Sequence, residues 1–177
     1  MNTHGRSGTS AIRTLLRTEW FSVEAVPFGK DGDPYYRLTC SDSVEILART
    51  TDRQIVLVKQ FRPAVGITML EMPSGHVGTD ESPVQAAWRE LEEETGYVGE
   101  VIEYLGAYKI SSSRINNDLH LFFVDGARKA KSQCAEDSHI EVVTVPIDDL
   151  VRYMTTGVCI EMAALAIYCL AQQRGLV

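Results

Sequence analysis

The sequence predicts an α+β protein, because candidate strands outnumber candidate helices and the two do not alternate regularly. The strand signals are short runs rich in aromatic and β-branched residues, and one helix is marked at both ends, between Ser82 and Gly96. With 177 residues, 45% of them hydrophobic, the chain can bury a core as one domain with a small appendage.

The N-terminal part predicts a β-hairpin that follows a polar tail at residues 1–10. Two runs, Glu19–Phe28 and Pro34–Cys40, flank a turn that contains Asp31-Gly32. Asp-Gly is a favoured hairpin turn. The tail lacks the apolar core of a secretion signal, so we expect it to be a loose extension.

Strand signals continue beyond residue 43 and are interrupted by helical ones. The expected strands are Ser43–Thr50, Arg53–Phe61, Ile67–Met72, Val101–Ile110, Leu119–Asp125 and Ile140–Val145. Besides the helix after Ser82, a short helix is expected over Pro146–Thr155 and a longer one over Ile160–Gln173. Residues 55–58 are apolar throughout, which indicates a strand covered on both faces.

The helix after Ser82 has clear start and stop signals. Ser82 is a good N-cap, Pro83 suits the first helical position, and Gln85 can complete a capping box. Gly96 can end the helix in a left-handed conformation. The spacing predicts one apolar stripe facing a core, formed by Val84, Ala87, Trp88 and Leu91.

Carboxylates crowd the same helix. At about 100° per residue, Glu90 and Glu94 lie on one flank with Glu93 next to Glu90, whereas Glu92 projects from the opposite flank. Converging carboxylates repel one another unless a hard cation lies among them. Arg89, one turn before Glu93, is placed to orient or partly neutralise the group. The alternative is an acidic, solvated helix face.

The spacing of these residues resembles a known motif. Gly75, five residues, Glu81, seven residues and then Arg89-Glu90-Leu91-Glu92-Glu93-Glu94-Thr95-Gly96 matches the Nudix box at every fixed charged or glycine position. Tyr97 departs from the usual aliphatic residue, which concerns packing and not chemistry. The segments Val58–Pro63 and Leu70–Gly75 are similar to those that precede the box in ADP-ribose pyrophosphatases and related sugar-nucleotide hydrolases.

This resemblance implies the fold and the domain organisation. We expect a mixed β-sheet sandwiched between helices, preceded by a small N-terminal antiparallel β-domain. The expected boundaries are a flexible tail at 1–10, the β-domain at 11–50 and the Nudix domain at 51–177. Proteins of this subgroup are commonly homodimers whose N-terminal domains help to build the partner's site, so a homodimer is expected here.

The resemblance also implies metal ligands and supporting residues. The expected ligands of Mg²⁺, for which Mn²⁺ is a plausible substitute, are Glu90, Glu93, Glu94 and the backbone carbonyl of Ser74. Glu93 and Arg89 are expected to assist catalysis. Supporting roles fall to Gly75, Glu81 and Gly96, and a salt bridge with a basic neighbour is the simpler reading of Glu81. The ions would neutralise a diphosphate and lower the pKa of a bound water.

The general base is expected downstream of the box, because a catalytic acid in this subgroup often comes from a distant loop. Glu136 is the first choice and Asp137 the second, in the segment before Ile140–Val145. The alternative is that both are solvated loop charges.

Substrate contacts are expected from residues outside the box. Arg62 can grip a phosphate with two hydrogen bonds, Glu71 can contact substrate or cap its loop, and Trp20 can stack on a base. A surface salt bridge is the alternative for Arg62, and core packing for Trp20.

The segment Lys109–Asp118 lacks the proline that ADP-ribose pyrophosphatases usually carry in this loop. Arg114 and Asn116 supply polar groups there that can read a sugar or a terminal phosphate. The loop leaves the identity of the group beyond the diphosphate open.

Composition excludes some classes of function. A formal net charge of −7 without a basic tract excludes duplex nucleic acid as a partner. The four cysteines have no CxxC spacing, as expected of free thiols in a reducing cytosol. The longest apolar run, Met162–Ala171, is too short to span a bilayer. A cytoplasmic protein without membrane contact is predicted.

The expected function is metal-dependent hydrolysis of the diphosphate linkage in a nucleotide sugar. ADP-ribose is the first candidate substrate, with AMP and ribose 5-phosphate as products. The alternatives are another substrate, such as GDP-mannose, NADH or a different nucleotide sugar, and a Nudix protein that binds nucleotides without hydrolysing them.

Overall fold

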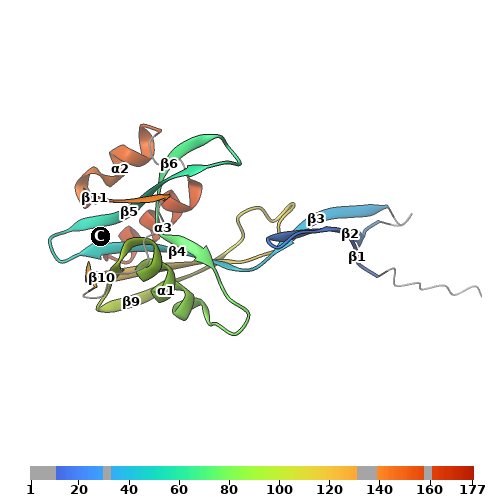
Figure 1. Ribbon diagram of the computed structural model, residues 1–177, viewed down its shortest axis with the longest axis horizontal. Helices are drawn as coiled ribbons and strands as arrows, with labels where there is room; N and C mark the ends of the chain where they lie inside the picture. Colours follow the sequence, from blue (N-terminus) through green and yellow to red (C-terminus); the bar gives the residue numbers. More distant parts are fainter. Residues whose placement is uncertain (1–10, 30–32, 131–138, 158–160) are drawn as a thin grey trace, which may run out of the picture. The chain divides into compact units, whose positions relative to one another are not determined.

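The structure is a computed structural model that describes residues 11–29, 33–130, 139–157 and 161–177 (Figure 1). The chain divides into two compact units. The first comprises Met1–Ser41 together with Lys109–Asn117, and the second comprises Asp42–Tyr108 and Asp118–Val177. A loop from the later half of the chain therefore belongs to the N-terminal unit.

The first unit is an antiparallel sheet of three strands in the order β1-β2-β3. These strands are β1 (Arg13–Arg17), β2 (Phe21–Pro27) and β3 (Pro34–Cys40). The predicted hairpin is confirmed, since β2 and β3 pair from Phe21 opposite Cys40 to Pro27 opposite Pro34. Strand β1 was not predicted, because every one of its residues is exposed and its sequence shows no alternation of polar and apolar residues.

The second unit contains an eight-stranded sheet with the central order β11-β5-β4-β10-β8, in which β6 pairs with β5, β7 with β4 and β9 with β10. Its strands are β4 (Ser43–Thr50), β5 (Gln54–Arg62), β6 (Ile67–Glu71), β7 (Ser74–His76), β8 (Tyr97–Val98), β9 (Val101–Tyr108), β10 (Leu119–Lys129) and β11 (Ile140–Pro146). Its helices are α1 (Pro83–Thr95), α2 (Ile147–Thr155) and α3 (Met162–Gln173).

Helices cover both faces of this sheet (Figure 1). On one face, Leu47 and Leu121 of the sheet pack with Leu150 of α2 and Ile167 of α3. On the other face, Val44 and other sheet residues pack with Ala86, Ala87 and Leu91 of α1. Strands β4 and β10 run parallel while the remaining pairs are antiparallel. The predicted α+β sandwich of a mixed sheet between helices, with a small antiparallel sheet before it, is confirmed.

The division between the units differs from the boundary expected at residue 50. It falls before β4, because β4 pairs with β10 and β5 in the centre of the large sheet. The tail at residues 1–10 lies outside the described residues. Among the described residues, no helix is both long enough and apolar enough to cross a membrane.

Helix α1 begins with the predicted capping box. The Ser82 hydroxyl accepts a hydrogen bond from the Gln85 N–H, and the Gln85 side chain accepts one from the Ser82 N–H at 2.9 Å. Gly96 ends the helix in the left-handed region at φ 69° and donates its N–H to the Glu92 carbonyl. Both ends of α1 are thus fixed by local contacts.

Replacing Ser82 with Ala is expected to lower the free energy of unfolding by about 1 kcal/mol, because it leaves an N-terminal amide of α1 without its acceptor. Chemical denaturation measures the change. Ser82→Asp, which keeps an acceptor oxygen, is the matched control and is expected to retain the stability of the wild type. Equal losses in the two variants would contradict a capping role.

Candidate functional site

Helix α1 turns one face to the core and another to a group of charges. Ala86, Ala87, Leu91 and Thr95 are buried. The predicted stripe is wrong at Val84, which is 39% exposed, because the first turn of the helix projects beyond the sheet-facing core. Trp88 packs against the core while remaining partly exposed.

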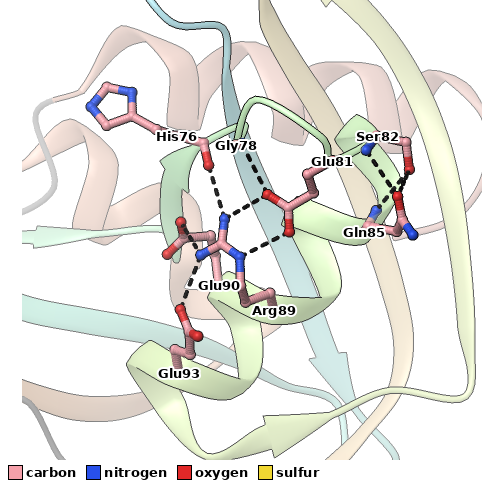
Figure 2. A network of polar contacts seen from close by, with 8 residues as sticks. All are labelled: His76, Gly78, Glu81, Ser82, Gln85, Arg89, Glu90 and Glu93. Atoms are coloured by element: carbon pink, nitrogen blue, oxygen red, sulfur yellow. Dashed lines mark hydrogen bonds and ion pairs between the residues drawn. The ribbon is translucent and has the colours of Figure 1, made fainter. Parts of the chain in front are cut away.

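Arg89 lies at the centre of the charged face, as Figure 2 shows. Its Nη1 atom lies 2.7 Å from Glu90 Oε1 and 3.0 Å from Glu93 Oε2. Its Nε and Nη2 atoms donate to the two oxygens of Glu81 at 2.9 and 2.8 Å. Nη2 also donates to the His76 carbonyl at 2.9 Å. One guanidinium therefore ties the loop before α1 to the helix itself.

The ion pair with Arg89 lowers the pKa of Glu81. The Arg89 hydrogen bonds, together with the Gly78 N–H, lower the pKa of Glu81 to about 2. Glu81 thus stays ionised as a permanent partner of Arg89, which agrees with the salt-bridge reading of this residue.

Glu94 lies in a different environment. Its carboxylate accepts a hydrogen bond from the Ser74 N–H at 2.9 Å, so the amide of Ser74 contacts this carboxylate directly. Burial, reinforced by the charges of Glu90 and Glu71, raises the pKa of Glu94 to about 7 against the effects of Ser74 and Arg62. Burial also raises the pKa of Glu90, which the contact with Arg89 opposes. Nearby positive charges and hydrogen-bond donors therefore do not offset the cost of burying the negative charges of Glu90 and Glu94.

Arg62 is engaged by Glu71. The Arg62 Nε donates to both Glu71 oxygens at 3.0 and 2.9 Å, and its Nη2 lies 2.8 Å from Oε2. Gln60 donates to the same carboxylate at 2.8 Å. Glu71 is almost fully buried, with a side chain only 1% exposed. The salt bridge weighed for Arg62 is present, although its partner is buried and not on the surface.

Gly75 occupies a position where a side chain has no room. A Cβ atom added there would overlap the Glu90 carboxylate. Gly75→Ala is therefore expected to displace Glu90 and to reduce about a hundredfold the turnover of the nucleotide sugar that the sequence resemblance implies as substrate, since misplacing a reacting group by about 1 Å costs that much.

Gly78→Ala is the matched control in the same loop. Its added Cβ would lie 3.3 Å from the nearest atom, Glu81 Oε2, at the end of a flexible side chain. Steady-state kinetics on the two variants, with thermal unfolding to verify folding, makes the comparison. Equal turnover in both would contradict the positional role of Gly75.

Glu45 is a buried carboxyl that the motif analysis did not identify. It lies on β4 opposite Ser74 of β7, and it is 3% exposed. Its Oε1 atom has no hydrogen-bond partner among the described residues. Burial, followed by repulsion from Glu161 and Glu71, raises the pKa of Glu45 to about 8.

The raised pKa of Glu45 predicts that the free energy of unfolding depends on pH. The pKa of Glu45 rises from its ordinary value of 4.5 to about 8 on folding, so the folded protein holds a proton that the unfolded chain releases. Stability contributed by this proton falls as the pH rises between those values. Glu45→Gln is therefore expected to be more stable than the wild type at pH 8.5 by at least about 1 kcal/mol, with little difference at pH 5.

Glu141→Gln is the control for this measurement, because Glu141 is 64% exposed beside Lys59. Urea denaturation at the two pH values gives the free energies. If the stability difference between the Glu45 variant and the wild type does not change with pH, the buried carboxyl is not responsible.

The residues present fit a divalent cation. Among the described residues, no three acidic, histidine or cysteine side chains are gathered closely enough to hold a metal ion by themselves, and Arg89 occupies the space between Glu90 and Glu93. Mg²⁺ is usually bound by one or two carboxylates together with waters and substrate phosphates. Glu90 and Glu94 lie one helical turn apart with raised pKa values, so they are the carboxylates that would hold such an ion.

The remaining residues predicted for substrate binding or base catalysis are not part of the charged face of α1. Trp20, Arg114 and Asn116 are part of the first unit, and Trp20 is 67% exposed, which excludes the core-packing alternative. Glu136 and Asp137 lie outside the described residues. Sequence reasoning missed Glu45 and Glu161, because a single acid in an apolar run and an acid before a helix carry no spacing signal.

Comparison with known proteins agrees with this geometry. The model of the NUDIX domain matches residues 41–160. The ADP-sugar pyrophosphatase of Mus musculus is 39% identical over 114 residues, which cover 60% of this chain and 52% of that protein. The ADP-ribose pyrophosphatase of Bacillus subtilis is 33% identical over 112 residues, covering 62% and 60%.

A solved structure shares the fold. The crystal structure of an ADP compounds hydrolase superposes with a TM-score of 0.77 at 18% sequence identity and covers 95% of both chains. The matched segments span only about half to three fifths of the two pyrophosphatases. Because the family model covers more than half of the chain and the fold agrees, the chain belongs to the Nudix family.

Proposed function

We propose that this protein is a divalent-cation-dependent pyrophosphohydrolase of nucleotide sugars, with ADP-ribose as its first substrate. The observation that supports it most strongly is the pair Glu90 and Glu94 on α1, which are partly buried carboxyls whose pKa values are raised. Two relatives are named as an ADP-sugar pyrophosphatase and an ADP-ribose pyrophosphatase.

The protein's own residues divide the task of holding the reactants. Glu90, Glu94, Glu93 and the Ser74 carbonyl would hold Mg²⁺, for which Mn²⁺ is the substitute. The bound ion supplies charge neutralisation for the diphosphate and a more acidic water. Arg89 fixes Glu90 and Glu93 in orientation, and the Ser74 N–H fixes Glu94.

The other assignments complete the proposal. Glu136 would accept the proton from the attacking water. Arg62 has its Nε and Nη2 on Glu71, so the remaining Nη1 would contact a phosphate. Hydrolysis of ADP-ribose would then yield AMP and ribose 5-phosphate.

A homodimer is part of the proposal. The first unit exposes many large apolar side chains for a sheet of three strands: Ile12, Leu15, Leu16, Trp20, Phe21, Phe28 and Tyr36. Large exposed apolar side chains in this number are typical of a surface that binds another protein. The location is proposed to be cytoplasmic, which agrees with four cysteines that lack CxxC spacing.

A turnover screen tests the function. ADP-ribose, GDP-mannose, NADH, UDP-glucose, diadenosine polyphosphates and nucleoside triphosphates would be incubated with Mg²⁺ or Mn²⁺, with Glu94→Gln as the blank. A strong preference for ADP-ribose is expected. Preference for another nucleotide sugar would retain the reaction class and reject the first substrate. Absence of turnover with every compound would reject the enzyme.

A further inference from the structure

A second group of carboxyls lies where the large sheet divides into two branches. Strands β4 and β5 pair directly over only two residues of each strand. Further along, β4 pairs with β7, whereas β5 pairs with β6. Glu45 belongs to the β4 branch and Glu71 to the β6 branch. Both side chains are almost fully buried, at 3% and 1% exposure, so the division of the sheet carries a buried carboxyl on each side.

Glu45 lies on the face of the sheet that helix α3 covers. Glu45 and Leu47 are two positions apart on β4, so their side chains share one face. Leu47 packs in the same cluster as Ala164 and Ile167 of α3. Glu161 occupies the N-cap position of that helix, and its side chain makes no capping hydrogen bond. Helix α1, which carries the Nudix box, packs on the other face. The strand and the start of α3 therefore bring two carboxyls together.

The Glu45 carboxyl has an oxygen without a protein donor. Its Oε1 atom is buried and has no hydrogen-bond partner among the described residues. Glu71 differs in this respect, because Gln60 and Arg62 both donate to its Oε2 atom, at 2.8 and 2.9 Å. Buried polar side-chain atoms are nearly always paired in folded proteins. The free acceptor on Glu45 therefore points to a ligand that the protein itself does not supply.

The charges around Glu45 indicate what kind of ligand this is. Glu161 and Glu71 both repel the Glu45 charge, and Glu71 also repels the Glu161 charge. Arg62 opposes this repulsion at Glu161, but its Nη2 atom lies 2.8 Å from Glu71 Oε2. Arg62 and Glu71 thus neutralise each other as an ion pair. The carboxylates of Glu45 and Glu161 leave two negative charges, which one divalent cation balances.

We propose that Glu45 and Glu161 bind a divalent cation at a site separate from the ion expected at Glu90 and Glu94. Mg²⁺ commonly takes one or two carboxylates and keeps several waters, so two carboxylates suffice although the described residues hold no group of three acidic, histidine or cysteine ligands. Because Glu45 lies opposite Ser74 of β7, the cation would join β4 and β7 to the start of α3. This site does not depend on the hydrolysis proposed above.

Binding of Mn²⁺ to the full chain, followed by the electron paramagnetic resonance signal of the free ion, tests the proposal. The measurement uses the variant Glu90→Gln/Glu94→Gln, which lacks the two box carboxylates. This variant is expected to retain one bound Mn²⁺ per chain. Adding Glu45→Gln or Glu161→Gln is expected to weaken that binding at least about tenfold, because each removes one of the two charged ligands.

Glu141→Gln, added to the same box variant, is the matched control. Its carboxylate is 64% exposed beside Lys59, and its loss is expected to leave Mn²⁺ affinity unchanged. Thermal unfolding with and without Mn²⁺ supplies a second measurement and verifies that each variant is folded. A ligand that binds only the folded state raises the unfolding temperature. Mn²⁺ is therefore expected to stabilise the box variant, and to stabilise it less after Glu45→Gln.

Three results would overturn the proposal. The first is the absence of Mn²⁺ binding in Glu90→Gln/Glu94→Gln, and the second is equal affinity with and without Glu45→Gln. The third is a loss from Glu141→Gln as large as that from Glu45→Gln, which would show diffuse attraction to an acidic surface. A protein without turnover in the substrate screen would leave these Mn²⁺ titrations unchanged, so the two proposals fail separately.

Discussion

A Glu94→Gln variant is expected to hydrolyse ADP-ribose about a thousandfold more slowly than the wild type. The substitution keeps the size of the side chain and a carbonyl acceptor for the Ser74 N–H, but it removes the negative charge that would hold the cation. Losing the charge stabilisation that a bound cation supplies costs several kcal/mol in the transition state. Initial rates under saturating Mg²⁺ measure the effect.

The stability of the same variant provides the control. Since burial raises the pKa of Glu94 to about 7, ionising this carboxyl destabilises the metal-free folded protein above that pH. Glu94→Gln is therefore expected to unfold at a higher temperature than wild type in EDTA at pH 8. A variant that is inactive and less stable would point to a folding defect, and one with near wild-type turnover would reject the metal assignment.

Arg62→Leu is expected to lower the free energy of unfolding by about 3 kcal/mol. The change leaves Glu71, whose side chain is only 1% exposed, with Gln60 as its one remaining side-chain donor among the described residues. The Arg62 side chain is itself 40% exposed, but removing it leaves the buried Glu71 charge in a medium that solvates it poorly. Chemical denaturation at neutral pH measures the loss.

Lys59→Leu on the same strand is the matched control. Lys59 pairs with Glu141 at 2.8 Å, but both side chains are about half exposed or more, at 48% and 64%. Such a surface pair contributes about 0–1 kcal/mol. The double variant Arg62→Leu/Glu71→Leu is expected to recover most of the stability, because apolar replacement of both partners removes the stranded charge. Equal losses in Arg62→Leu and Lys59→Leu would contradict the burial argument.

The sequence predicted the features of the fold that depend on local contacts and on motif spacing. Both ends of α1 follow from Ser82, Gln85 and Gly96, whose capping contacts need no tertiary partner. The contact of Arg89 with Glu93 follows from their i,i+4 spacing. The strand at residues 55–58 is buried on both faces, as its uniform apolar sequence indicated.

Other features depend on contacts that no local pattern reveals. Strands β7 and β8 have only three and two residues, too few to show a period. The loop Lys109–Asn117 joins the first unit through hydrogen bonds with β3, far away in sequence. Val84 was assigned to the core by periodicity, which cannot tell where the supporting sheet ends. The position of Glu45 opposite Ser74 depends on strand register.

The parallel pairing of β4 with β10 constrains how the protein reaches its native state. Leu119 lies opposite Ser43, more than 70 positions earlier in the chain, so the centre of the large sheet cannot close until β10 has been synthesised. Helix α1, which lies between them in sequence, leaves the ribosome before β10 has supplied Phe122 and Val124 to the cluster that buries Leu91. Contacts of such high sequence separation fold slowly and leave apolar segments open to aggregation in the meantime. Nascent chains that stop before β10 should therefore depend on chaperones, whereas chains extended past β11 should collapse cooperatively.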